Sequence, residues 1–266
     1  MIRLGALFAL LSFMTPTAWA DKPMLSLVID DLGYSFEQAK KVLSLPGNHT
    51  FAIIPDTTYS QKIAQYAHEN GHEVMLHMPM QSSTDLIIES TALNEQMTEQ
   101  EIAEGVINML QDVPFIKGIN NHMGSRLTEM GYIMRPVMET IKQQNAALYF
   151  LDSRTSALST AYHQALAAGV PTLKRDVFLD ADRTNPDSIR EQYERWLELA
   201  RENGHAVAIA HPYQNTIDIL LEKLEQTTQE FEFITLSQQV ANLQQEENEW
   251  PKYLSHLQMD SKSSKQ

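Results

Sequence analysis

The sequence contains no cysteine, which excludes disulfides, thiolate metal ligands and lipidation of a cysteine. Stability must therefore come from a packed core, and 43% hydrophobic residues in a chain of 266 can supply one. Positive charge is scarce too, because 20 Lys and Arg stand against 34 Asp and Glu, giving a net charge of −14. Phosphate binding relies on clustered Lys and Arg, so we expect neither nucleic acid nor anionic lipid as a partner. A neutral or amino-bearing glycan is compatible with this surface.

No apolar run reaches the roughly 20 residues that a membrane span needs. The run Leu4–Met14 follows the single cation Arg3 and precedes the small-x-small sequence AWA at 18–20, which is the layout of a cleavable secretory signal. An uncleaved anchor is the alternative, but the short run favours cleavage after Ala20. We therefore predict a signal peptide at 1–20, a periplasmic location if the source is bacterial, and no membrane anchoring of the mature chain.

Strand-like apolar runs alternate with amphipathic stretches from residue 25 to 240, and no linker rich in Pro, Gly or Ser interrupts them. The predicted strands are 25–30, 50–54, 73–78, 116–120, 147–152, 171–179 and 206–211, followed by a short one at 233–237 and a short helix. The predicted helices are 36–44, 59–69, 98–111, 130–144, 156–167, 187–202 and 214–225. Thr98 and Glu101 form a plausible capping box for the third of these.

Seven strand–helix pairs predict parallel strands with right-handed crossovers in a single α/β domain over residues 21–243. Either a barrel or an open doubly wound sheet fits the pattern. The polar residues 244–266 are predicted to be a disordered tail.

Ionisable side chains gather at the ends of the predicted strands. In parallel α/β folds this is the edge at which ligands bind. A single Asp after a strand is usually a turn former, and a single His in a strand is usually a core residue. Here, however, six of the seven predicted strands carry such residues, among them Asp30, Asp31, His77, His122, Asp152, Arg154, Asp176 and His211.

This set of residue types meets a chemical specification. Two imidazoles and one carboxylate are usual protein ligands of a catalytic Zn²⁺, a second carboxylate can act as general base, and a further histidine can protonate a leaving group. Without cysteine, Zn²⁺, Ni²⁺, Co²⁺ or Mn²⁺ is favoured over softer metals. Ser125 and Ser153 lie near histidines, but neither occupies a G-x-S-x-G elbow, so a serine hydrolase is disfavoured.

Six ordered segments resemble motifs of the divergent polysaccharide deacetylases, which are similar to the NodB-homology deacetylases. These segments are IDDLG, HEVMLHMPM, NNHMGSRLT, LYFLDSRT, LKRDVFLD and AIAHPY, and they extend over about residues 24–240. The resemblance implies a distorted (β/α) barrel of about seven parallel strands. It also implies a metal-dependent hydrolase that removes N- or O-acetyl groups from a glycan such as a cell-envelope polysaccharide.

Carried over by position, the resemblance makes Asp30 the general base, Asp31 and His77 metal ligands and His211 the general acid. It implies orienting or substrate-contacting roles for Asp152, Arg154 and Asp176. We add Arg154 or backbone N–H groups as donors to an oxyanion, and Asn121, Ser125 and Tyr213 as candidate substrate-binding residues.

The sequence departs from the ordinary family pattern at two points. Gln81 stands four residues after His77, where a second histidine is expected, and His122 is the obvious replacement as third ligand of one divalent ion, with zinc as our prediction. The arginine-proline motif expected after the fourth strand is replaced by NNHMGS. Two alternatives stay open: a periplasmic glycan-binding protein on an inactive barrel, and amidase or esterase chemistry on another substrate. The oligomeric state is not predicted.

Overall fold

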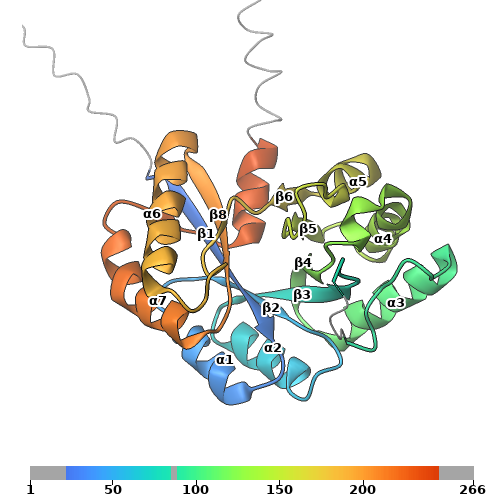
Figure 1. Ribbon diagram of the computed structural model, residues 1–266, viewed down its shortest axis with the longest axis horizontal. Coiled ribbons are helices and arrows are strands. Elements are labelled where there is room, and N and C mark those ends of the chain that lie inside the picture. The colour runs from blue at the N-terminus through green and yellow to red at the C-terminus, as the bar shows by residue number, and fades with distance from the viewer. Residues whose placement is uncertain (1–21, 85–88, 246–266) are drawn as a thin grey trace, which may run out of the picture.

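The computed structural model describes residues 22–84 and 89–245, so the predicted signal peptide and residues 246–266 of the predicted tail lie outside the described residues. The chain forms one α/β domain around a curled, parallel sheet (Figure 1). The strands are β1 (Met24–Leu32), β2 (Thr50–Ile53), β3 (Glu73–Met80), β4 (Ile116–Met123), β5 (Tyr149–Asp152), β6 (Thr172–Lys174), β7 (Val177–Phe178), β8 (His205–Ala210) and β9 (Glu232–Phe233).

The helices cover the outside of the sheet, as Figure 1 shows. They are α1 (Phe36–Leu43), α2 (Ser60–Glu69), α3 (Glu99–Asp112), α4 (Gly131–Gln144), α5 (Ala161–Ala168), α6 (Pro186–Asn203) and α7 (Gln214–Thr227), with a 3-10 turn at Leu127–Glu129 and a last helix at 236–245. The predicted capping box of α3 is confirmed, since Thr98 and Glu101 cap each other's backbone N–H groups. No helix in the described ranges is long and apolar enough to cross a membrane.

The strand order is β6-β5-β4-β3-β2-β1-β8-β7, with β9 beside the start of β1, and these strands pair in parallel throughout the described residues. The predicted distorted α/β barrel in a single domain is confirmed. The prediction of one strand at 171–179 is wrong, because this segment forms two short strands on opposite edges of the sheet. β6 pairs with β5, whereas β7 pairs with β8.

Arg175 and Asp176 carry the chain from one edge of the sheet to the other. The Arg175 N–H donates to the carbonyl of Asp152 on β5 at 3.0 Å, and the Asp176 N–H donates to the carbonyl of Val207 on β8 at 2.9 Å. Within the described residues, β6 and β7 form no ladder with each other. We call this crossing the seam: here the barrel is closed by the covalent chain in place of a row of strand hydrogen bonds.

The predicted strand at 233–237 is also wrong, since β9 ends at Phe233 and a helix starts at residue 236. Thr235 and Gln238 explain the early helix. The Thr235 N–H donates to Oε1 of Gln238 at 2.9 Å, and the Gln238 N–H reaches Oγ1 of Thr235 at 3.5 Å. This reciprocal arrangement is a capping box, which ends the strand and begins the helix.

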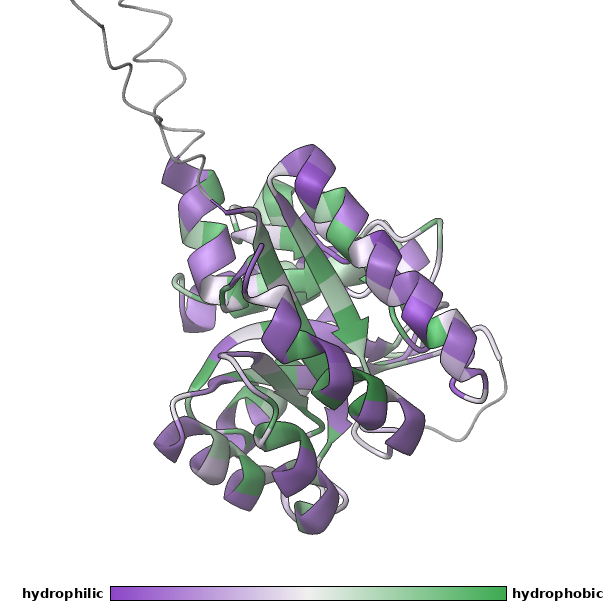
Figure 2. Ribbon diagram, turned by 90° about the vertical axis from the view of Figure 1, so that its left-hand side faces the viewer, coloured by the Kyte–Doolittle hydropathy of each residue, from purple (hydrophilic) through white to green (hydrophobic). Residues whose placement is uncertain are grey.

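Alternation along the strands separates two cores. Outward residues such as Leu27 and Ile29 pack under the helices, while inward residues such as Val28, Tyr149 and Val207 fill the barrel beneath the last helix. Figure 2 shows the same division, with hydrophobic strands inside and hydrophilic outer faces on the helices.

Gly118 is required where β4 passes the ring of Tyr149 on β5. A Cβ atom there would lie 2.3 Å from the ring of Tyr149, whose hydroxyl donates to the buried Glu73 at 2.6 Å. Towards the carboxyl ends of the strands the inward positions become polar, with Asp30, His77 and Asn120 all buried. The fold therefore places a polar centre above a barrel floor that is mostly hydrophobic but includes the buried Glu73.

Candidate metal centre

A β-bulge at the end of β1 directs two neighbouring carboxylates to one place. The register with β2 shifts between Ile29 and Leu32, and Asp31 adopts the left-handed conformation with φ of 59°. Strict alternation would send Asp30 and Asp31 to opposite faces, whereas a bulge re-aims a side chain. As a result, Nε2 of His77 lies 3.7 Å from Oδ2 of Asp30 and 3.2 Å from Oδ1 of Asp31.

Asp31, His77 and His122 form a cluster that could hold a metal ion. Nδ1 of His122 lies 2.9 Å from Oδ1 of Asp31 and 3.1 Å from Nε2 of His77, and the third side of the triangle is 3.2 Å. Ligands about 2.1 Å from a metal lie about 3.0 to 3.4 Å apart in octahedral or tetrahedral geometry. The triangle therefore has the dimensions of one face of a coordination polyhedron.

The chemistry of the three atoms also fits a divalent cation. An ionised carboxylate can only accept, and a neutral imidazole whose other nitrogen donates presents a lone pair. Burial raises the pKa of Asp31, but hydrogen bonds from His122 and His77 outweigh burial and hold that pKa well below its ordinary value. Burial lowers the pKa of His77, but the charges of Asp30 and Asp31 outweigh it and raise the pKa. The carboxylates of Asp30 and Asp31 therefore favour positive charge at the place where a cation would bind.

Asn120 connects the metal cluster to Asp30. Its Oδ1 lies 2.7 Å from Nδ1 of His77, and its Nδ2 donates to Oδ1 of Asp30 at 2.9 Å. The amide orientation is fixed, because the Asp30 carboxylate can only accept. The amide oxygen then accepts Nδ1–H from His77, which leaves Nε2 as the candidate ligand atom.

His211 faces the same centre from the end of β8. Asp180 accepts both its backbone N–H, at 2.7 Å, and its Nδ1–H, at 2.9 Å, while Nε2 lies 3.8 Å from Oδ2 of Asp31. The hydroxyl of Thr216 also donates to Asp180 at 2.9 Å. Burial lowers the pKa of His211, but Asp180 and the charge of Asp31 outweigh burial and raise it to about 9. Nε2 is therefore a protonated donor near neutral pH.

Aromatic rings and guanidinium groups form a row along the His211 side. The imidazole lies 5.2 Å from the Phe178 ring and is stacked on the Tyr213 ring at 5.5 Å. Arg175 lies 4.9 Å from the Phe178 ring and Arg183 lies 4.9 Å from the Tyr213 ring. Tyr213, a predicted substrate-binding residue, is thus placed beside the centre.

Two other predicted site residues, Asp152 and Asn121, hold backbone near the centre, and a third, Arg154, lies beside them. Asp152 accepts the N–H of Arg154 at 2.8 Å and the hydroxyl of Ser159 at 2.8 Å, which orders residues 153–160 as a loop, so that α5 begins at residue 161 and not at 156. Asn121 accepts the N–H of Ser153 at 3.0 Å and donates to the carbonyl of Met123 at 2.7 Å. Arg154 follows β5 with φ of 50°, at the same edge as Asp31.

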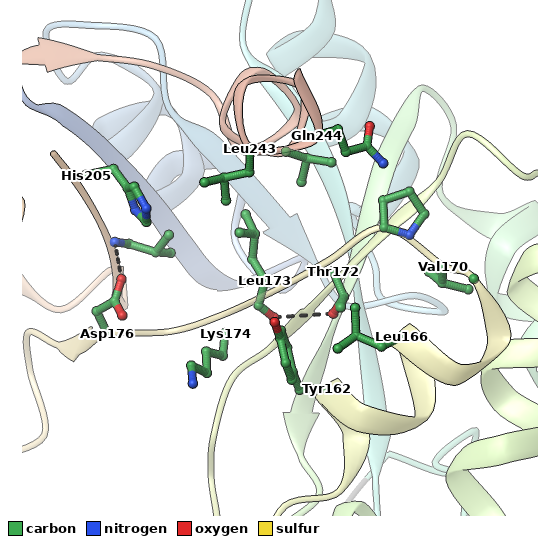
Figure 3. Close-up of a pocket in the computed structure, with 14 residues that line it drawn as sticks. Tyr162, Leu166, Val170, Thr172, Leu173, Lys174, Asp176, His205, Leu243 and Gln244 are labelled. Atoms are coloured by element: carbon green, nitrogen blue, oxygen red, sulfur yellow. Dashed lines mark hydrogen bonds between the residues drawn. The ribbon is translucent and has the colours of Figure 1, made fainter. Parts of the chain in front are cut away.

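Ser125 and Asp176, also predicted site residues, form hydrogen bonds with backbone N–H groups of other segments. Ser125 accepts the N–H of Ser83 at 2.9 Å and so fixes the segment after β3. Asp176 accepts the N–H of Val207 at 2.8 Å, level with Ser26 of β1 and well before Asp30. It lines a cavity of about 530 Å³ at the seam, under Leu243 of the last helix, as Figure 3 shows. Asp180, and not Asp176, is therefore the carboxylate beside His211.

Three contributors were given no site role from the sequence: Asn120 and Asp180, which were noted only as polar residues near strand ends, and Glu89, which was not noted. Asn120 lies two residues before His122, so the strand period of two could have assigned both to the inward face. No spacing signal distinguishes Asp180 from Asp176. Glu89 lies 3.6 Å from Nε2 of His122, outside every predicted strand, and no sequence signal identifies it.

The fold and centre define a parallel (β/α)-barrel protein with a candidate Asp–His–His metal site at the carboxyl ends of its strands. The chain belongs to the divergent polysaccharide deacetylase family, whose family model matches residues 27–240.

Two relatives support this membership. The uncharacterized protein YibQ of Escherichia coli K12 is 39% identical over 215 residues, which cover 81% of this chain and 66% of YibQ, just under two thirds of that relative. An uncharacterized protein of Haemophilus influenzae is 33% identical over 210 residues, covering 79% of this chain and 74% of the relative.

Solved structures share the fold. The uncharacterized protein ATU2773 of Agrobacterium tumefaciens C58 has a TM-score of 0.76 at 24% identity, covering 84% of this chain and 91% of that one. The peptidoglycan deacetylase PdaC of Bacillus subtilis has a TM-score of 0.51 at 13% identity, covering 88% of this chain and 97% of that one.

Proposed function

We propose that the protein is a metal-dependent hydrolase that removes acetyl groups from a cell-envelope polysaccharide in the periplasm, with one zinc ion as its cofactor. The observation that carries the proposal is the convergence of Asp30, Asp31, His77, His122 and His211 from four strands on one centre. Membership of the deacetylase family supports the same reading.

Asp31, His77 and His122 are the residues that would hold the metal. When bound, it would supply a Lewis acid for the acetyl carbonyl and make water more acidic. Asp30 is suited to accept the proton of the attacking water, because Asn120 holds one of its oxygens and leaves the other directed towards the centre. The water oxygen forms the new bond to the acetyl carbon.

His211 is suited to protonate the leaving group. Its Nδ1–H is held by Asp180, so Nε2–H is the proton it can deliver to the departing amine or hydroxyl as the acetyl bond breaks. Arg154 remains our candidate donor to the developing oxyanion. The products are acetate and the deacetylated sugar, and the protons on Asp30 and His211 are exchanged with solvent to restore the starting state.

The aromatic row suits a glycan substrate. Tyr213 and Phe178 lie beside the general acid, and aromatic faces of this kind are suited to packing against the apolar face of a sugar ring. PdaC, which shares the fold, is a peptidoglycan deacetylase, so peptidoglycan fragments are a sensible first substrate.

Acetate release tests the proposal. Zinc-loaded protein is incubated with acetylated chitooligosaccharides and with peptidoglycan fragments, alongside Asp30→Asn and the surface control Asp218→Asn. We expect release by the wild type and the control, and loss of about 10²- to 10⁴-fold in Asp30→Asn with zinc retained. Zinc binding with no acetate from any substrate would contradict the hydrolase.

A glycan-binding protein on an inactive barrel is the second candidate. The missing arginine-proline motif favours it. Glycan binding by the zinc-loaded wild type without acetate release would support this alternative.

A further inference from the structure

The two candidate histidine ligands use their remaining nitrogens differently. His77 donates Nδ1–H to the neutral amide of Asn120. His122 presents Nδ1 to the cluster, and its Nε2 lies 3.6 Å from Oε2 of Glu89. That carboxylate oxygen is buried and has no hydrogen-bond partner among the described residues.

Glu89 is held in this position by its surroundings. The hydroxyl of Tyr34 donates to its Oε1 at 2.6 Å, and the N–H of Ala92 donates to its carbonyl at 3.0 Å to close a turn. Directly after this turn, Leu93 bridges to Met80 at the end of β3. The bridge fixes the segment next to β4, on which His122 lies.

We propose that Glu89 is a positioning residue for the metal centre, holding His122 through its Nε2–H. The proposal rests on the proposed metal site. Metal-bound histidines almost always donate their second ring N–H to a carboxylate, carbonyl or water, which fixes the ring and raises its basicity. The gap of 3.6 Å is only about 0.5 Å longer than a normal hydrogen bond, so a small ring rotation closes it.

Glu89 is not a ligand in this arrangement. It faces Nε2, whereas the cluster faces Nδ1, and these nitrogens lie on opposite sides of the imidazole. Its second oxygen is occupied by Tyr34. With a metal bound in place of the Nδ1 proton, a hydrogen bond from Nε2–H to Glu89 would leave the Nδ1 lone pair of His122 for the metal, as Asn120 does for Nε2 of His77.

Zinc affinity tests this role without any need for turnover. Zinc binding by the full chain is measured by competition with a chromophoric chelator, for the wild type, Glu89→Gln and Tyr34→Phe. Glu89→Gln keeps the shape and can still accept from Tyr34, but removes the charge, so we expect zinc to bind about 10- to 100-fold more weakly. Tyr34→Phe keeps the charge, and we expect a smaller loss.

Glu95→Gln is the matched control, because Glu95 lies in the same segment but pairs with Arg126 at the surface. It should bind zinc as the wild type does, and all metal-free variants should unfold at the wild-type temperature. The visible spectrum of cobalt-loaded protein should change in Glu89→Gln and not in Glu95→Gln.

Wild-type zinc affinity in Glu89→Gln would overturn the proposal, as would a wild type that binds no divalent metal. Zinc binding that depends on Glu89 without acetate release would instead refute the hydrolase and leave the role of Glu89 standing.

Discussion

Replacing Asp180 by Asn should lower the pKa of His211 and move the alkaline limit of activity to lower pH. Asp180 is buried and accepts three hydrogen bonds, two of them from His211. An Asn side chain keeps the size but removes the charge. The Asn side chain also places its NH₂ group against a hydrogen-bond donor, because the backbone N–H and Nδ1–H of His211 and the hydroxyl of Thr216 all donate to Asp180.

The size of the expected pKa change can be estimated from the structure. The difference between the ordinary pKa of 6.5 and about 9 corresponds to about 3 kcal/mol, since each pKa unit is worth about 1.4 kcal/mol. Burial opposes the rise, and Asp180 is the first of the groups that cause it, ahead of Asp31. We therefore expect a fall of at least about one pKa unit, or about 1.4 kcal/mol.

The stability of the metal-free protein should fall as the pH rises, because the pKa of His211 is raised in the folded state. Protonated His211 stabilises the metal-free fold fully below pH 6.5, and this contribution is lost as the pH rises to about 9. The protonated form of His211, our proposed general acid, is lost over the same rise. In Asp180→Asn both losses should therefore occur at lower pH.

NMR titration of histidine-labelled protein measures the pKa of His211 directly. The dependence of kcat/KM on pH between pH 6 and 10 measures the alkaline limit of activity. Thr216→Val is the control, because it removes one donor to Asp180 while leaving both bonds to His211. An unchanged His211 titration in Asp180→Asn would refute the electrostatic reasoning.

The remaining predictions concern the centre and the barrel floor. Asn120→Leu removes the acceptor of His77, so zinc should bind about 10- to 100-fold more weakly in chelator competition. Zinc affinity should fall with decreasing pH, by up to about tenfold per pH unit below the raised pKa of His77, because zinc must displace that proton. Gly118→Ala should cost about 1–3 kcal/mol in urea unfolding through overlap with Tyr149. Gly131→Ala, which meets only the flexible end of a glutamine, should cost far less; equal losses would contradict the overlap.

The fold was predictable where the hydrophobic periodicity and the capping residues at helix ends agree. Apolar runs between amphipathic stretches indicated the parallel barrel, and Thr98 with Glu101 indicated the start of α3. The seam was not predictable, because residues 171–179 read as one extended run and only tertiary pairing divides it. The last predicted strand failed because the local capping box at Thr235 competes with its β-branched and aromatic residues.

The centre was predictable in its members but not in its geometry. The positions of Asp30, His77 and His211 at strand ends follow from the alternation of elements. The bulge that turns Asp31 inward leaves no sequence signature, since its left-handed residue is not a glycine. Asp180 lies in the turn after β7, and only the pairing of β7 with β8 brings it to His211.

The strand order has a consequence for how the protein folds. Strands β1 to β6 pair in chain order, whereas β8 inserts between β7 and β1, so one edge of β1 is unpaired until β8 arrives. Non-local pairing of this kind is slow, and we expect β8 amides to gain hydrogen-exchange protection last in pulse-labelled refolding. Asp31, His77 and His122 lie on β1, β3 and β4, so the metal triangle can assemble before His211 joins it. If a metal ion binds to this triangle during folding, it would stabilise the partly folded barrel before β8 pairs with β1. His211, the proposed general acid, would then be the last residue of the site to reach its position.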